Sequence, residues 1–232
     1  MSKDLVEHAI DSILESISSG RFKEERPLPP ESELANLLGV SRLTMREAVQ
    51  VLKDRGVLEV IHGRGTYINP ISQWQDLSAV AAFLSHQKNP FDLGYQLLEV
   101  RRMIEVGACA LASQRCSEAD LSAMADDLRR FDEADAVGDV TAVAQADMAF
   151  HQHIHTASGN PFIGTIMMPL QKALAVSRTA TSADVSVRQR AQQHHKKIYR
   201  AISARDAAAA EAAMQAHMTQ TAEDLASLRV QK

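Results

Sequence analysis

The stretch LPPESELANLLGVSRLTMREAVQVLKDRGVLEVIHGRGTYI, residues Leu28–Ile68, contains two short segments with helical spacing followed by two β-prone segments. A first helix is expected over Glu31–Leu38, and Gly39 allows the tight turn that ends it. Ser41 is well placed to cap a second helix. Two short helices joined by a glycine turn are typical of a helix-turn-helix, so this stretch predicts that motif.

The expected second helix has an apolar face and a basic N-terminal end. Its apolar residues recur at helical spacing, which leaves the polar residues at the N-terminal end free of the core. A recognition helix presents this end to the major groove of DNA, where an arginine side chain can bond guanine O6 and N7. The apolar residues are Met45, Ala48, Val49 and Leu52, and the polar ones are Arg42, Thr44 and Arg46.

The residues after the second helix predict a β-hairpin wing. VLEVI and TYI are β-prone, and the two glycines of the intervening HGRG allow a tight connection. A wing at this place would bring His62, Gly63 and Arg64 to the DNA backbone or the minor groove. The alternative is an ordinary small domain with solvated arginines, and the position of the wing disfavours it.

The composition of the 232-residue chain is that of a soluble globular protein, with 45% apolar and 4% aromatic residues. The polar, acidic N-terminus lacks the basic and then apolar segments of a signal peptide. No run approaches the roughly 20 apolar residues of a membrane span. A cytoplasmic protein is therefore expected. The formal net charge of −4 does not by itself indicate a nucleic-acid partner, so any DNA binding must depend on a local site.

After about residue 70 the apolar residues recur almost everywhere at the spacing of an α-helix. Breaks at KNPFD, CSEAD, VGDV, SGNP, TSADV and ARDA carry either N-cap residues or glycine, which gives about seven helices. We therefore expect a mainly α protein. A winged helix-turn-helix domain would occupy residues 1–70, and an all-α antiparallel bundle of about six to seven helices would occupy residues 71–232.

One acid and three histidines occur within DMAFHQHIH, residues Asp147–His155. On a helix, Asp147, His151 and His155 lie within one stripe, whereas His153 points elsewhere. An aspartate and a histidine four residues apart are commonly just a surface hydrogen bond. This pair alone therefore does not decide between a metal site and a polar face.

Two histidines further along the chain favour a metal site. His195 in HHKKIYRAI and His217 in MQAHM lie on separate expected helices, and an antiparallel bundle could bring both against Asp147 and His151. Three imidazoles and a carboxylate suit a divalent transition ion, with zinc first and manganese or nickel as alternatives. An octahedral ion would keep two positions open.

Other polar residues of these segments have simpler interpretations. If the four residues bind a metal, His155 and His194 are best explained as surface residues. In LLEVRRMIEVGACALAS, spacing alone favours exposed intrahelical ion pairs among Glu99, Arg101 and Glu105. Such pairs contribute a few tenths of a kcal/mol each.

The stretch Leu28–Ile68 resembles, along its full length, the winged helix-turn-helix of the GntR family of bacterial transcription regulators. One departure is Ser32, because relatives often carry at this position an arginine that supports a phosphate or base contact. The resemblance implies DNA contacts from the recognition helix and from the wing tip. These contacts would come from Ser41, Arg42, Thr44 and Arg46 in the helix and from His62 and Gly63 in the wing.

The runs EVRRMIE, DMAFHQHIHTASGN, HHKKIYRAI and MQAHM resemble, in order and spacing, the ligand-sensing FCD domain of the FadR subfamily in its metal-binding form. By that resemblance Asp147, His151, His195 and His217 are metal ligands, and Arg101 holds the carboxylate of an effector. The likeness spans about residues 8 to 225, and the expected helix around Trp74 to His86 fits the seven-helix version of the domain.

The resemblance implies a homodimeric regulator that binds a short palindromic operator in double-stranded DNA. Most relatives of this type are repressors, so the expected function is repression of a sugar-acid or organic-acid catabolic operon. A small carboxylate effector bound at the metal would release the DNA. Two alternatives stay open. One is a metal-dependent enzyme, although no general base is evident beyond the ligands. The other is a sensor that binds its effector without metal.

Overall fold

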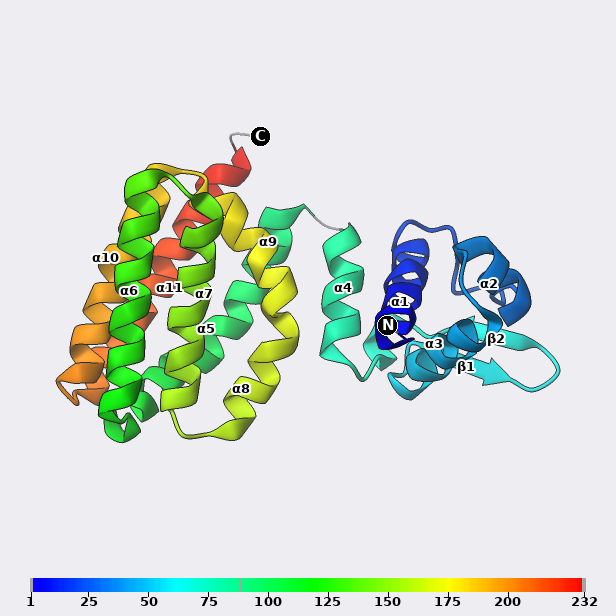
Figure 1. Cartoon of the computed structure of the whole chain (residues 1–232), viewed down its shortest axis with the longest axis horizontal. Coiled ribbons are helices and arrows are strands. Elements are labelled where there is room, and N and C mark those ends of the chain that lie inside the picture. The colour runs from blue at the N-terminus through cyan, green and yellow to red at the C-terminus, as the bar shows by residue number, and fades with distance from the viewer. Residues whose placement is uncertain (1, 88, 231–232) are drawn as a thin grey trace. The chain divides into compact units, whose positions relative to one another are not determined.

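The computed structural model describes residues 2–87 and 89–230, and most of them are helical (Figure 1). The chain divides into two compact units, Met1–Lys88 and Asn89–Lys232. Among the described residues, β structure is confined to one two-stranded sheet, so the expected mainly α fold is confirmed. Every helix in this part of the chain is too short or too polar to span a membrane.

The first unit consists of four α-helices, a 3₁₀ turn and a β-hairpin. The chain order is α1 (Ser2–Ser18), α2 (Glu31–Leu38), α3 (Arg42–Asp54), β1 (Leu58–Ile61), β2 (Gly65–Ile68), η1 (Ile71–Gln73) and α4 (Leu77–Gln87). Apolar residues of α1, α2, α3 and the hairpin form one core. Burial of this apolar surface is what holds the short helices together, since helices of eight to seventeen residues are marginal in isolation.

The turn between α2 and α3 is fixed by a glycine and a serine. Gly39 ends α2 at φ 68°, in the left-handed region that a residue with a Cβ rarely adopts. Ser41 caps α3, because its Oγ accepts a hydrogen bond from the backbone N–H of Thr44 at 3.0 Å. The predicted helix-turn-helix is therefore present, with the expected cap.

The predicted wing is an antiparallel hairpin. Leu58 of β1 lies opposite Ile68 of β2, and Ile61 lies opposite Gly65. Both glycines of HGRG have positive φ, which allows the chain to reverse at the exposed residues 62–64. The guanidinium of Arg64 lies 5.7 Å from the ring centroid of Tyr67, so a cation–π contact supports the tip.

Helix α4 belongs to the first unit, because it packs on α1. Ala79 joins the core of that unit, and the rings of Trp74 and Phe83 meet with centroids 5.0 Å apart. The compact division thus differs from the domain boundary expected near residue 70. The apolar face of α4 completes the small N-terminal core rather than that of the bundle.

The second unit is a helical bundle in which α5 contacts α7, α9, α10 and α11 (Figure 1). The predicted breaks all fall at helix boundaries, and Pro169 adds a further interruption because it cannot donate a backbone hydrogen bond. The elements are α5 (Pro90–Arg115), α6 (Glu118–Val137), α7 (Val140–Ala157), α8 (Pro161–Met167), η2 (Met168–Leu170), α9 (Gln171–Ser182), α10 (Val185–Ser203) and α11 (Ala207–Val230).

The core of the bundle is drawn from α5, α6, α7, α10 and α11. Phe150, Ile154, Ile198 and Met214 are among its fully buried members. Polar side chains are buried in the same unit, including both arginines and histidines. Buried charges are rare in proteins unless they are paired or used for binding, so these polar residues mark the region to inspect.

Candidate functional site

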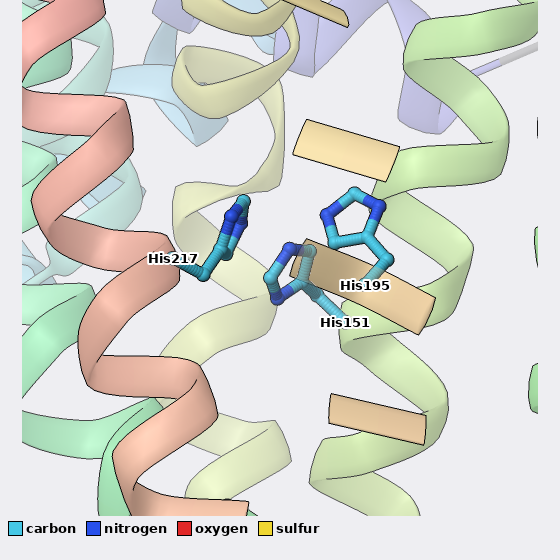
Figure 2. Close-up of side chains that lie close together, drawn as sticks. All are labelled: His151, His195 and His217. Atoms are coloured by element: carbon cyan, nitrogen blue, oxygen red, sulfur yellow. The ribbon is translucent and has the colours of Figure 1, made fainter. Parts of the chain in front are cut away.

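Three buried imidazoles converge inside the bundle, as Figure 2 shows. His151 comes from α7, His195 from α10 and His217 from α11. One ring nitrogen of each lies within 4.8 Å of the others, and the residues are only 2%, 0% and 2% exposed. Three nitrogen atoms at this spacing can ligate a single ion. We call these residues the histidine cluster.

Aromatic packing holds the rings in place. The ring of Phe150 lies 5.0 Å from that of His195, and Phe131 meets the same imidazole edge-on at 5.8 Å. The rings of His195 and His217 are 4.7 Å apart, and those of His151 and His217 stack at 5.3 Å. The cluster is thus enclosed by well-packed side chains, which limits how far the nitrogen atoms can move.

The hydrogen bonds of the cluster leave nitrogen atoms available. His151 Nδ1 lies 2.6 Å from Glu105 Oε2, and His195 Nδ1 lies 3.3 Å from Gln192 Oε1. The amide nitrogen of Gln192 donates to a backbone carbonyl at 2.8 Å, so its oxygen is the atom that faces His195. Nε2 of His195 and Nδ1 of His217 are buried without a hydrogen-bond partner. Such atoms are costly unless a ligand binds them, so these residues fit a metal ion.

Two of the three imidazoles, those of His151 and His217, are in the neutral form that binds metals. Burial lowers the pKa of His151 to about 3, an effect that Glu105 opposes and Arg178 reinforces. Burial and the neighbouring imidazole of His195 also hold the pKa of His217 well below its usual value. Both side chains are therefore neutral near pH 7, and no proton has to leave them before a metal binds.

Asp147, the fourth predicted ligand, lies beside the cluster, and its carboxylate contacts both His195 and an arginine. Its Oδ1 lies 3.2 Å from His195 Nε2, and its Oδ2 lies 2.5 Å from Arg178 Nη1. Burial would raise the pKa of Asp147, but Arg178 and His195 hold it well below its usual value. The carboxylate is ionised, and the structure brings all four predicted residues to one place.

Arg101 is also at this place, on α5. Its Nε donates to Glu105 Oε1 at 2.8 Å, and its Nη2 lies 3.2 Å from His151 Nε2. The predicted pairing of Arg101 with Glu105 is present, but its expected exposure is wrong, because the side chains are only 5% and 1% exposed. Helices pack around α5 on several sides, so a polar pair that spacing assigns to the surface is enclosed.

The expected surface location of His155 is also wrong. This residue is 7% exposed, because α9 packs against α7 on this side. Its Nε2 lies 3.7 Å from Glu105 Oε1 and has no hydrogen-bond partner. His194 is half-buried. His153 lies away from the cluster, as its position in the helical stripe predicts, and its Nδ1 contacts Asp127 of α6.

A cavity of about 40 Å³ adjoins the histidine cluster. Arg101, Arg178 and Gln220 line it together with Asp147 and His217. Guanidinium groups suit the two oxygens of a carboxylate. The buried Oε1 of Gln220 has no partner and can accept a hydrogen bond. The cavity therefore offers recognition groups for a small polar anion beside the metal-ligating nitrogens.

Sequence reasoning missed most of the residues that line this cavity, Arg178 and Gln220 among them, and it missed the surroundings of Glu105. Arg178 lies among small polar residues in SRTATS, and no spacing rule connects α9 to α7. Gln220 follows His217 by three residues on α11, so helical spacing was an available signal. Glu105 was recognised as a partner of Arg101, but its contact with His151 required the packing of α5 on α7.

In the first unit, the predicted DNA-contacting residues lie on the accessible side of α3 and at the tip of the hairpin. The predicted apolar face of α3 is buried, as expected. Leu43, which was not predicted, is 67% exposed at the same end of the helix, and Ser32 is exposed on α2. The predicted residues are Ser41, Arg42, Arg46, His62, Gly63 and Arg64, all exposed, and the half-buried Thr44.

The metal-free protein is expected to lose stability as the pH falls below about 6.5. The folded-state pKa of His151 is about 3, so the unfolded chain takes up protons in this range that the folded chain does not. The free energy of unfolding then decreases with falling pH. Urea denaturation of the chelator-treated chain, repeated from pH 7.5 to about 4.5, measures this slope. In His151→Gln the slope should be shallower, and an equal slope would contradict a buried neutral imidazole.

Comparison with protein families gives two matches. Residues 5–68 match the family described as "Bacterial regulatory proteins, gntR family", and residues 96–220 match the FCD domain. The first match contains the helix-turn-helix and the wing. The second contains the whole histidine cluster together with Asp147 and Arg101.

Curated relatives match over most of the chain. The HTH-type transcriptional regulator LutR of Bacillus subtilis (strain 168) is 35% identical over 209 residues, which cover 88% of this chain and 93% of LutR. The Glc operon transcriptional activator of Escherichia coli (strain K12) is 27% identical, with 99% and 92% covered. A protein of the same strain named as an L-lactate dehydrogenase operon regulator is 29% identical, with 94% and 85% covered.

Solved structures agree with this fold. The chain is similar to a GntR protein of Streptococcus agalactiae, with 26% identity, a TM-score of 0.54, and 94% and 99% of the two chains covered. Lar of Listeria monocytogenes shares the fold at 17% identity, with a TM-score of 0.66 and 95% and 96% covered. These families and relatives are transcription regulators rather than enzymes. The chain therefore belongs to the GntR family of DNA-binding transcription regulators, and an FCD domain follows its winged helix-turn-helix.

Proposed function

We propose that this regulator is a homodimeric, metal-dependent sensor of a small hydroxy acid or sugar acid, and that it represses the operon that degrades this compound until the effector releases it from DNA. The observation that supports this most directly is the buried histidine cluster beside a cavity lined by three arginines, Arg101, Arg178 and Arg188. DNA binding is assigned to the winged helix-turn-helix within residues 1–70, and sensing to the helices that follow.

The DNA interface is assigned to α3 and the wing. Two exposed arginines, Arg42 and Arg46, lie four residues apart on α3 and can reach base edges or phosphates in the major groove. Ser41 and Thr44 lie at the N-terminal end of the same helix, where backbone and side-chain donors suit a phosphate. His62, Gly63 and Arg64 are assigned to the backbone or minor groove. Two copies of the unit would read the two halves of a palindrome.

The metal ligands are assigned to Asp147, His151, His195 and His217. Zinc is the first candidate, because it accepts both imidazole nitrogen and carboxylate oxygen. When bound, the metal would supply a Lewis acid that attracts a carboxylate or hydroxyl oxygen of the effector. The protein supplies the neutral imidazoles of His151 and His217, an ionised Asp147 and closely packed neighbours that keep these groups in place.

The effector site is assigned to the cavity beside the metal ligands. Arg101 is the predicted partner of the effector carboxylate, and the structure adds Arg178 and the amide oxygen of Gln220 as neighbours. A carboxylate would suit the guanidinium groups, and a hydroxyl group could donate to the amide oxygen. The name of the relative that regulates an L-lactate dehydrogenase operon supports a hydroxy acid. A coupling of about 1–3 kcal/mol would change DNA affinity roughly 5- to 150-fold.

A mobility-shift assay on the DNA upstream of the regulator's own gene tests this function. Zinc-loaded protein is titrated with lactate, glycolate and gluconate, and propionate serves as a carboxylate control without a hydroxyl group. We expect a hydroxy acid to release the DNA from the zinc-loaded protein. After the metal is removed with a chelator, the same acid should no longer release the DNA. Retention of less than about a tenth of an equivalent of metal in protein purified without chelator would contradict the metal site.

Arg101→Lys is expected to raise the effector concentration needed for half-release of DNA by about tenfold, because lysine keeps the charge but not the bidentate geometry. DNA affinity without effector and zinc content should be unchanged. The matched control is Arg129→Lys, which alters an exposed arginine on α6. An Arg101→Lys protein with the wild-type effector response would contradict the assignment of Arg101.

A further inference from the structure

The carboxylate of Glu105 connects two elements of the site. It lies on α5 and is 1% exposed. Its Oε1 accepts a hydrogen bond from Arg101 Nε at 2.8 Å, and its Oε2 lies 2.6 Å from His151 Nδ1 on α7. Arg101 Nη2 also donates to Oε2 at 3.4 Å, so the carboxylate forms a two-point ion pair with a guanidinium that stays charged. The group is therefore an ionised acceptor with no proton of its own to donate.

This contact determines which nitrogen of His151 carries the proton. An ionised carboxylate only accepts hydrogen bonds, so at 2.6 Å the Nδ1 of His151 must be the donor. In a neutral imidazole the lone pair then resides on Nε2. Consistent with this, Nε2 faces a donor, because Arg101 Nη2 lies 3.2 Å from it. A ring nitrogen with a free lone pair is the one that can ligate a metal.

His195 shows the same arrangement with a neutral partner. Its Nδ1 lies 3.3 Å from the side-chain oxygen of Gln192, and its Nε2 lies 3.2 Å from Asp147 Oδ1 without forming a hydrogen bond. Two histidines from different helices thus have Nδ1 next to an acceptor oxygen, while Nε2 lies beside Arg101 in one and beside Asp147 in the other. Glu105 differs from Gln192 in its charge, its shorter distance and its second contact with Arg101.

We propose that Glu105 is a positioning residue of the histidine cluster, which fixes the Nδ1–H tautomer and the ring orientation of His151 so that Nε2 is presented to the metal. This inference rests on the metal site of the proposed function. Partners of this kind orient the ligand, and a carboxylate partner also makes the imidazole more basic. The ion pair with Arg101, at 2.8 Å, is a second contact that restrains the carboxylate.

The zinc affinity of the Glu105→Gln variant tests whether Glu105 contributes to metal binding. Competition with a chromophoric chelator should show affinity about 10- to 100-fold below wild type, because the amide has no charge and a single acceptor oxygen for two donors. Glu99→Gln, an exposed residue of the same helix, is the matched control and should bind as wild type does. Circular dichroism checks that the variants fold. Wild-type affinity in a folded Glu105→Gln protein would overturn the proposal.

A measurement on the unmodified chain keeps the proposal testable even if Glu105→Gln does not fold. Long-range ¹H–¹⁵N spectra of the metal-free protein report the tautomer of each histidine, and the signals that disappear in His151→Gln identify His151. The Nδ1–H tautomer is expected. An Nε2–H tautomer would overturn the role of Glu105. A wild-type protein that binds no zinc but has the Nδ1–H tautomer would instead contradict the metal part of the proposed function.

Discussion

Replacing His195 with alanine is expected to lower zinc affinity by about 100-fold or more and to make DNA binding insensitive to the effector. His195 is fully buried, and its Nε2 has no hydrogen-bond partner. The substitution removes one nitrogen donor of the cluster, together with the 3.2 Å contact of Nε2 with Asp147 and the 3.3 Å contact of Nδ1 with Gln192. DNA binding without effector should persist, because His195 lies in the bundle and not in the winged helix-turn-helix.

The experiment combines chelator competition, elemental analysis and the mobility-shift assay on the full chain. His153→Ala is the matched control, since this histidine lies on α7 but outside the cluster, with 38% of its side chain exposed. Loss of the imidazole leaves a void beside Phe150 and Phe131, so some loss of thermal stability is also expected. Unchanged zinc affinity and effector response in His195→Ala would show that this imidazole only packs.

Arg46→Ala is expected to weaken specific operator binding by about 1–3 kcal/mol, or roughly 5- to 150-fold, while the protein stays folded. The side chain is exposed on α3, outside the buried stripe of Met45, Ala48 and Leu52, so the core does not depend on it. An arginine that bonds a guanine carries sequence discrimination. Binding to unrelated DNA should therefore change much less than binding to the operator.

Titrations of operator and scrambled DNA at several salt concentrations measure this effect. Arg129→Ala, which removes an exposed arginine from the bundle, is the matched control and should behave as wild type. If Arg46 contacts a phosphate instead, affinity should fall for both DNAs. The slope of log affinity against log salt concentration should then become shallower by about one unit, because one fewer counterion is released. Retained operator preference and affinity would contradict the placement of α3 in the major groove.

The helix-turn-helix could be predicted in detail because its determinants are local. Gly39 ends one helix, Ser41 begins the next, and the glycines of HGRG permit the hairpin, all within a few residues of the structure that they specify. Each signal acts through backbone conformation or a short hydrogen bond. Such signals can be read from the sequence without knowing how the rest of the chain packs.

The bundle site could be predicted only in part, because its remaining determinants are tertiary. The spacing of Asp147 and His151 places them on one face of α7, and their convergence with His195 and His217 followed from the bundle topology and the family resemblance. No spacing rule connects Arg178 of α9 to Asp147. Similarly, the burial of Glu105 and His155 depends on helices that pack from elsewhere in the chain.

The unpartnered imidazole nitrogens also constrain how this protein can evolve. A leucine or phenylalanine at these positions would remove a desolvation penalty and fill the same space, and such replacements of buried polar groups are often neutral or stabilising. Selection for thermal stability alone should therefore replace these histidines early, yielding a more stable regulator that lacks the proposed metal site. Their persistence in a lineage would record continued selection for responsiveness at the expense of stability.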